Sequence, residues 1–101
     1  MAIDLSAQEL QLVKDILSKL LPGVEVWVFG SRISGKPKPY SDLDLVLRAA
    51  AALPTERLAE LAEAFDASNL SFRVDLIDWH RIGPEFQKII LDKHELLSPA
   101  N

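Results

Sequence analysis

The sequence predicts a small domain of the α/β class, and two observations support this prediction. Segments with apolar residues at helical spacing alternate with short runs rich in β-branched and aromatic residues, in the order helix, strand, strand, helix, strand, helix. The composition is globular, because 49% of the 101 residues are hydrophobic and 26% are charged. We therefore expect residues 1–101 to form one domain with one modest core, with residues 98–101 as a loose tail.

The charge and composition narrow the classes of function. The net charge of −4 and the pI of about 5.0 disfavour general nucleic-acid binding, which needs a basic face to displace counterions. The chain has no cysteine and hence no disulfide or thiolate metal site. The N-terminal stretch MAIDLSAQELQ does not resemble a signal peptide, and no apolar run approaches the ~20 residues of a membrane span. We expect a cytoplasmic protein that does not bind membranes.

The first predicted element is a helix that begins at Ser6. Ser6 and Glu9 have the spacing of a capping box, in which each side chain satisfies a free backbone N–H group of the other residue. The inward face consists of apolar residues at helical spacing: Leu10, Val13, Ile16, Leu17 and Leu20. Pro22-Gly23 ends the helix.

Two strands are predicted next. Residues 24–29 form a short run of β-branched and aromatic residues that ends at a turn, Gly30-Ser31. Residues 31–35 are expected to make a short helical turn, and the prolines and glycine of residues 35–41 predict a loop. The second strand covers residues 41–48.

The second half of the chain predicts a helix, a strand and a last helix. Residues 55–67 have an apolar stripe opposite a charged face, which is typical of a surface helix. Residues 72–77 form the third strand, and Pro84 suits the first turn of the last helix. The expected inward residues of that helix are Phe86, Ile89, Ile90 and Leu97.

Asp42 and Asp44 stand one residue apart in an apolar segment that is otherwise typical of a buried strand. Residues i and i+2 of a strand point to the same face, so both carboxylates are predicted to project side by side. The leucines between and after them then point to the opposite face: Leu43, Leu45 and Leu47. Adjacent carboxylates disfavour each other's ionisation unless a cation lies between them, and such oxygen ligands suit Mg²⁺.

Asp75 is the third candidate carboxylate, in the middle of the apolar segment FRVDLID. If its strand lies beside that of Asp44, three carboxylates converge and can hold two metal ions about 3.5–4 Å apart. Asp78 is the rival candidate, but it faces the opposite side and lies where the strand ends, a position typical of a capping residue. Strand parity also places Arg73 on the face of Asp75, where it can orient that carboxylate.

The turn at Gly30-Ser31 is a candidate phosphate site. Glycine lets the backbone approach a ligand closely, backbone N–H groups at such a turn bind phosphate, and the serine hydroxyl can add a hydrogen bond. Arg32, Lys36 and Lys38 follow closely enough to offset the charge of a triphosphate. For both lysines, a solvated loop position is the more ordinary interpretation.

These parts together predict nucleotidyl transfer. The β- and γ-phosphates of a nucleoside triphosphate would lie on the Gly-Ser turn, and metal ions held by the carboxylates would bridge the phosphates. An acceptor hydroxyl would attack the α-phosphorus, Asp75 would help to remove its proton, and pyrophosphate would leave.

The segment GSRISGKPKPYSDLD matches the signature GSx₁₀DxD, with Gly30-Ser31, ten residues, and then Asp42-Leu43-Asp44. In these residues the chain resembles the DNA polymerase β-like nucleotidyltransferase superfamily. Members of that superfamily carry a third acidic residue in a later strand, where this chain has Asp75. The length, and the short helix after that strand, look like the minimal nucleotidyltransferase (MNT) branch. The resemblance covers roughly residues 6–97.

The resemblance implies a mixed β-sheet flanked by helices, ATP or another nucleoside triphosphate as substrate, and Mg²⁺ at a two-metal site. Its motif positions correspond to catalytic and metal-binding residues Asp42, Asp44 and Asp75, and to nucleotide-binding residues Gly30, Ser31 and Arg32. Many MNT proteins are encoded beside a helical HEPN-domain toxin with ribonuclease activity, and members of the family act as antitoxins that transfer AMP to a tyrosine of the toxin. One departure is visible: the segment after Gly-Ser is often RARG and here is RISG, which removes one phosphate contact.

Other interpretations stay open at the level of sequence. Asp42 can cap a turn and Asp44 can be an exposed strand residue, although the combination with Gly30-Ser31 and Asp75 disfavours this. The protein can also be an antitoxin that neutralises its toxin by contact alone. A third alternative is a nucleotidyltransferase for a small hydroxylated molecule, which the short chain disfavours because such enzymes usually enclose their substrate with an extra domain. Self-association is left open.

Overall fold

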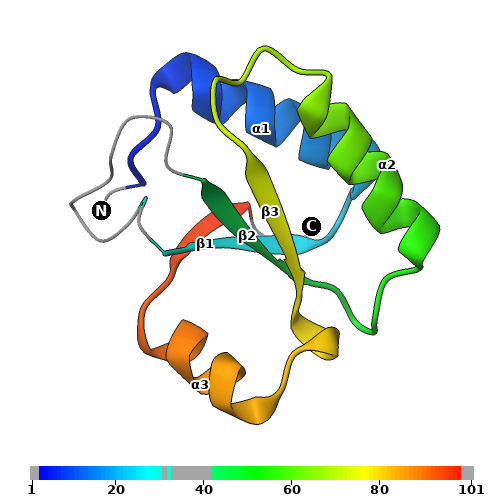
Figure 1. The fold of residues 1–101 in the computed structure, drawn as a ribbon, viewed down its shortest axis with the longest axis vertical. Coiled ribbons are helices and arrows are strands. Elements are labelled where there is room, and N and C mark those ends of the chain that lie inside the picture. The colour runs from blue at the N-terminus through cyan, green and yellow to red at the C-terminus, as the bar shows by residue number, and fades with distance from the viewer. Residues whose placement is uncertain (1–2, 31, 33–41, 99–101) are drawn as a thin grey trace.

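The protein folds into helices packed on a four-stranded sheet (Figure 1). A computed structural model describes residues 3–30, 32 and 42–98. The elements of this part of the chain, in order, are α1 (Ala7–Leu20), β1 (Glu25–Phe29), β2 (Leu43–Arg48), α2 (Thr55–Asp66), β3 (Val74–Asp78), the 3₁₀ helix η2 (Trp79–Arg81), α3 (Pro84–Asp92) and β4 (Glu95–Ser98). The predicted α/β class is confirmed.

The sheet is mixed, as the resemblance implied. Its strand order is β3-β2-β1-β4, so the two strands that flank the Gly30 turn lie in the centre. β1 is antiparallel to both β2 and β4, whereas β2 and β3 are parallel. The parallel pair needs a crossover, and α2 supplies it between β2 and β3. The candidate acidic residues therefore lie at one end of neighbouring strands.

The first helix begins where the capping box predicts. The Ser6 hydroxyl accepts a hydrogen bond from the backbone N–H of Glu9 at 3.1 Å, and the Ser6 N–H donates to the Glu9 carboxylate at 2.9 Å. Each bond gives a protein acceptor to a backbone N–H group that has no partner within the helix. The helix ends at Leu20, before Pro22, which also agrees with the prediction.

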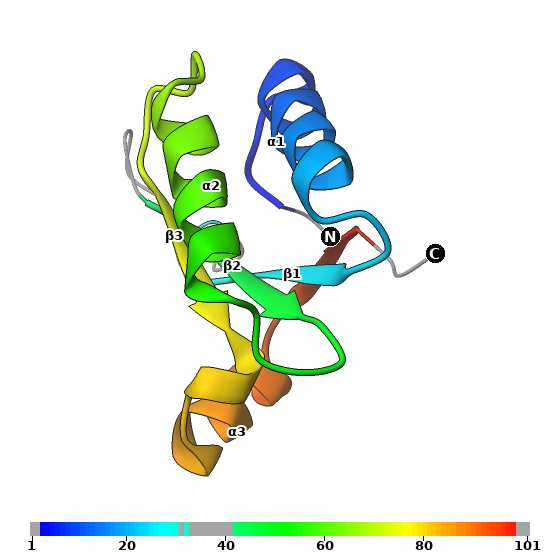
Figure 2. The same cartoon turned by 90° about the vertical axis from the view of Figure 1, so that its right-hand side faces the viewer.

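One face of the sheet packs against α1 and α2, which lie side by side (Figure 2). The alternation of β2 supplies the strand side of this core, because Leu43, Leu45 and Leu47 are fully buried there. Their helical partners include Val13 and Leu17 of α1, and α2 adds two more buried apolar residues. The predicted inward orientation of the three leucines is confirmed.

The opposite face of the sheet packs against α3 in a smaller cluster. Trp27, Val46 and Ile90 are buried there, and the partly buried residues around them are Phe29, Ile77, Trp79, Ile82 and Phe86. α3 lies on the side of the sheet away from α1 and α2 (Figure 2). Val46 shares the parity of Asp44 on β2, so the candidate carboxylates belong to this second face.

The prediction for the C-terminal segment was wrong in three respects. The last helix ends at Asp92, and residues 95–98 form β4, which pairs with β1. Leu97 is buried, as expected, but on a strand, whereas Ile89 is 57% exposed instead of facing inward. Ser98, expected in a loose tail, is part of β4, and residues 99–101 lie outside the described part of the chain.

Several predicted features lie outside the described residues. They include the hydroxyl of Ser31, the loop with Lys36 and Lys38, and most of the short helical turn. Among the helices of residues 3–30, 32 and 42–98, none has the length and apolar character needed to cross a membrane.

Candidate active site

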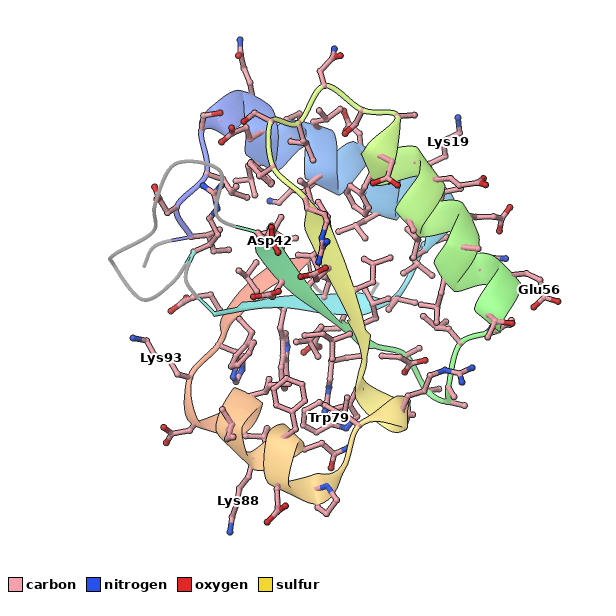
Figure 3. All side chains as sticks on the ribbon, in the orientation of Figure 1. Lys19, Asp42, Glu56, Trp79, Lys88 and Lys93 are labelled. Atoms are coloured by element: carbon pink, nitrogen blue, oxygen red, sulfur yellow. The ribbon has the colours of Figure 1, made fainter. Side chains whose placement is uncertain are left out.

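The three carboxylates predicted from the sequence come from two neighbouring strands. Asp42 directly precedes β2, Asp44 lies in β2, and Asp75 lies in β3. The parallel register pairs Asp44 with Asp75, which places the two residues side by side on the same face of the sheet. The backbone N–H of Leu43 donates to the carbonyl of Arg73 at 2.9 Å and so fixes the start of this pairing. In Figure 3, Asp42 lies at the end of β2 where it meets β3.

The environment of Asp44 disfavours its charged form. Burial raises its pKa from 3.8 to about 6, and the negative charges of Asp75 and Asp42 add to the rise, together with a hydrogen bond to the Asp75 side chain. The positive charge of Arg73 lowers the pKa in part. A carboxylate whose ionisation is disfavoured by its acidic neighbours indicates a site that attracts positive charge.

Arg73 supplies positive charge to the cluster. One guanidinium nitrogen, Nη2, lies 3.2 Å from Oδ1 of Asp75 and 3.8 Å from Oδ2 of Asp42. The parity argument predicted that Arg73 faces Asp75, but the contact with Asp42 was not foreseen because it joins two strands. This contact depends on the register of β2 and β3, which the sequence alone does not give.

Gly30 closes the site on the side of β1. Its φ of +91° lies in the region that favours glycine. A Cβ atom added to Gly30 would lie 2.5 Å from Oδ2 of Asp44, so the carboxylate of Asp44 would have to shift. Residue 29 is the register partner of Asp44, which explains why the next residue comes so close. The backbone conformation therefore favours glycine, and the missing Cβ atom leaves room for the carboxylate of Asp44.

Arg32 is held within the protein. Its side chain is buried, its Nη1 donates to the carbonyl of Asp4 at 3.1 Å, and its guanidinium lies 4.3 Å from the ring centroid of Phe72. The backbone N–H of Asp4 also donates to the carbonyl of Arg32 at 2.7 Å. These contacts join Arg32 to the N-terminal segment and to Phe72. The contact of Arg32 with phosphate stays a prediction.

Asp78, the rival third carboxylate, has a structural role. It is buried and accepts hydrogen bonds from the backbone N–H groups of Leu53 at 2.8 Å and His80 at 3.0 Å. Its carboxylate also contacts Nε of Arg81 at 3.3 Å. The predicted capping role of Asp78 is confirmed, and the residue joins the end of β3 to the segment that leads into α2.

Sequence reasoning did not identify the aromatic layer beside the carboxylates. Phe29 and Phe86 pack edge to face with 5.6 Å between ring centroids, and Arg48 lies over the rings of both Trp27 and Trp79. Trp79 is seen beneath the sheet near α3 in Figure 3. The signal was the shared parity of residues 27 and 29 on β1, which predicts one aromatic face.

The donor set suits a hard divalent cation, which prefers carboxylate oxygens. The side chains of Asp42 and Asp75, however, are arranged around the guanidinium of Arg73. In the described part of the chain, no group of three or more histidine, cysteine, aspartate or glutamate side chains is arranged to hold a metal ion. The carboxylates suit Mg²⁺ in chemistry, while their side chains are oriented towards Arg73.

Sequence comparison finds a matching family model and a relative of this chain. Residues 11–101 match the family model for "Polymerase beta, Nucleotidyltransferase". The chain is 46% identical over 88 residues to the probable protein adenylyltransferase MntA of Haemophilus influenzae, which covers 87% of this chain and 77% of the relative.

Solved structures agree with the sequence comparison. A toxin–antitoxin crystal structure with AMP-PNP superposes with a TM-score of 0.76 at 25% identity, over 91% of this chain and 74% of the other. A tri-AMPylated Shewanella oneidensis HEPN toxin in complex with its MNT antitoxin matches with a TM-score of 0.62 at 27% identity, over 90% of this chain and 73% of the other. An MntA–HepT toxin–antitoxin structure, at 21% identity and a TM-score of 0.70 over 94% and 74% of the two chains, shares the fold.

Proposed function

Because this chain belongs to the polymerase beta nucleotidyltransferase family, we propose that it transfers AMP from ATP to a hydroxyl group of a partner toxin and is the antitoxin of that pair. The probable adenylyltransferase activity of its Haemophilus relative supports the reaction. The relatives with bound AMP-PNP and with a tri-AMPylated HEPN toxin support ATP as the donor and a HEPN protein as the acceptor. Within this chain, the pairing of Asp44 with Asp75 beside Gly30 is the observation that carries the proposal.

The acidic cluster is the proposed metal site. Asp42, Asp44 and Asp75 would hold Mg²⁺, which when bound supplies positive charge to the phosphates and to the leaving oxygen. Their position supports this role, because all three lie where β2 and β3 meet on the face that α1 and α2 leave open. The raised pKa of Asp44 supports it too, since the cluster is most stable with a cation beside it.

Asp75 is the proposed proton acceptor. It lies on β3, an outer strand of the sheet, and its side chain is 39% exposed, so a hydroxyl presented by another protein can reach it. In the proposed step, the acceptor oxygen forms a bond to the α-phosphorus while the bond from that phosphorus to the bridging oxygen breaks. The hydroxyl proton passes to a carboxylate oxygen of Asp75, and pyrophosphate leaves.

The turn after β1 is the proposed phosphate site. Gly30 brings the backbone into contact with Asp44, so phosphates bound at the turn would lie beside the acidic cluster. Ser31 would donate its hydroxyl to a phosphate oxygen. We assign Arg32 to holding this turn in place, because its guanidinium contacts the carbonyl of Asp4 and the ring of Phe72.

Labelling tests the proposal. The purified protein is incubated with Mg²⁺, ATP labelled at the α-phosphate, and the HEPN protein encoded beside it. We expect label on the HEPN protein, loss of that label with Asp44→Asn or with the Asp42→Asn/Asp44→Asn double variant, and retention with Glu63→Gln, which neutralises an exposed carboxylate on α2. Tight binding of the partner by all forms without any label would contradict transfer and identify an interaction module.

A further inference from the structure

The contact of Arg73 with two carboxylates has a consequence for metal binding. We propose that Arg73 is the resident counter-ion of the acidic cluster, and that a divalent cation binds only by displacing its guanidinium from Asp42 and Asp75. The inference rests on the proposed function, because it takes these carboxylates to be the metal ligands. It adds to that function a residue that sets how readily the site accepts metal.

The geometry shows why Arg73 and a metal ion compete. Nη2 of Arg73 lies 3.2 Å from Asp75 Oδ1 and 3.8 Å from Asp42 Oδ2, so it occupies the region that faces both carboxylates. Mg²⁺ binds carboxylate oxygens at about 2.0–2.1 Å and keeps several waters around it. The guanidinium and the metal ion would also repel each other if both lay between these carboxylates. Both cannot occupy the region between Asp42 and Asp75.

Arg73 is placed to leave without disturbing the fold. Its side chain is 69% exposed, and no described packing contact covers its guanidinium, whereas its backbone carbonyl is fixed by the N–H of Leu43 at 2.9 Å. Exposed ion pairs stabilise a protein only weakly, so the side chain can turn into solvent at low cost. The backbone hydrogen bond keeps Arg73 beside the cluster, so its guanidinium can pair with the carboxylates again when the metal dissociates.

The charge balance explains why such a counter-ion is needed. Asp42, Asp44 and Asp75 lie on one face with mutual repulsion, and among the described residues Arg73 is a cation that offsets it. Asp78, by contrast, is satisfied by backbone N–H groups and by Arg81 within the fold, so it does not share this counter-ion. Arg73 therefore offsets part of the repulsion in the metal-free protein and competes with a metal ion for the same carboxylates.

Binding of Mn²⁺ without nucleotide tests the proposal, because it has a readout independent of activity. The free Mn²⁺ signal in electron paramagnetic resonance is measured for the wild type, Arg73→Gln, Arg73→Lys and Arg57→Gln. Arg57 is the matched control, since it is an exposed arginine on α2 paired with Glu60. We expect Arg73→Gln to bind Mn²⁺ at least about five-fold more tightly than the wild type, the factor for removing one unit charge about 4 Å away in water.

The other variants separate the effect of Arg73 itself from that of its charge and of the net charge of the protein. Arg73→Lys is expected between the wild type and Arg73→Gln, because an ammonium keeps the charge but lacks the planar fork of guanidinium. It also serves if Arg73→Gln does not fold in chelator. Arg57→Gln is expected to bind Mn²⁺ as the wild type does, which excludes an effect of net charge alone.

Three outcomes overturn the proposal in different ways. Equal Mn²⁺ affinity for the wild type and Arg73→Gln, with AMP transfer intact in the wild type, contradicts the role of Arg73 and leaves the proposed function standing. Weaker binding of the Mn²⁺–ATP complex by Arg73→Gln, without tighter binding of Mn²⁺ alone, identifies Arg73 as a phosphate ligand instead. Absence of Mn²⁺ binding by every form, with and without ATP, contradicts the metal site itself.

Discussion

At the scale of single residues, the carboxylate of Asp44 works against the stability of the protein. Its pKa is raised from 3.8 to about 6, which means that the folded state disfavours its charged form. Below pH 3.8 the group is protonated in both the folded and the unfolded state and has no effect on stability. As the pH rises from 3.8 to about 6, the unfolded state ionises first, so the folded state loses relative stability, and the loss is complete above pH 6.

Asp44→Asn is therefore expected to stabilise the protein above pH 6 in the presence of chelator. Solvent screening of this partly exposed group limits the gain to about 1 kcal/mol, or about 4–8 °C in the unfolding temperature. The difference from the wild type should vanish near pH 4. Thermal unfolding by circular dichroism across this pH range measures it, with Glu63→Gln as the charge-matched control. A variant that is less stable than the wild type at pH 7.5 would show that Asp44 contributes favourable contacts instead.

Gly30→Ala tests the close approach of β1 to Asp44. A Cβ atom there would lie 2.5 Å from the carboxylate, and the φ of +91° disfavours any side chain. We expect a loss of about 1–2 kcal/mol from the backbone alone, with a further loss from the contact, and AMP transfer should fall with it. Gly83→Ala is the control, because a Cβ atom at Gly83 meets no atom within 4 Å. Denaturant unfolding that ranks the two variants equally would contradict this account.

At the scale of elements, the sequence predicted those parts whose signals are local. The capping box of Ser6 and Glu9 fixed the start of α1, and the alternation of Asp44 with its leucine neighbours predicted which face of β2 is buried. β4 was missed because its strand character depends on β1, about seventy residues earlier in the chain. The apolar residues of α3 and β4 also continue a helical spacing, and neither glycine nor proline separates them.

In the candidate site, too, the sequence predicted the local features and missed those that depend on contacts between distant segments. Strand parity predicted that Asp42 and Asp44 share a face and that Asp78 points away from Asp75, because parity needs only the local backbone, whereas the convergence of Asp75 with Asp44 depended on the pairing of β2 with β3. The contact of Arg73 with Asp42 could not be predicted, since it requires the register between β2 and β3. The buried position of Arg32 depends likewise on the packing of the N-terminal segment and Phe72.

Ser6→Ala tests the capping box as the signal that starts α1. The substitution removes the acceptor for the Glu9 N–H, and we expect a loss of about 1 kcal/mol in the free energy of unfolding with AMP transfer unchanged. Ser18→Ala makes the same change inside the helix and should be neutral or slightly stabilising, since alanine is the better helix former. Urea unfolding compares them, and equal effects would mean that the cap does not determine the start of α1.

At the scale of the whole molecule, the sheet separates two apolar clusters with different neighbours. The larger cluster lies under α1 and α2, and the smaller one lies under α3 on the face that carries the acidic residues. Ile90 is fully buried in the smaller cluster, against Trp27 and Val46. The packing of α3 therefore supports the face on which the proposed chemistry takes place.

Ile90→Ala is expected to destabilise the protein by about 2–5 kcal/mol, because it leaves a cavity in the smaller cluster. The neighbouring Ile89→Ala is the control, since Ile89 is 57% exposed and its truncation should change stability by less than about 0.5 kcal/mol. Both variants are compared by guanidinium unfolding. Similar losses for the two would indicate that α3 is not held by its buried stripe.

The alternation of β2 has a consequence for how this protein can change over generations. Its leucines are buried in the core, while Asp42 and Asp44, which stand on either side of Leu43, serve the proposed chemistry. Mutations can therefore erase one property and leave the other intact. A descendant that retains the leucines but loses the aspartates would keep its shape, and with it any surface by which it holds a partner. Such a lineage could drift from enzyme to pure binder without passing through an unfolded ancestor.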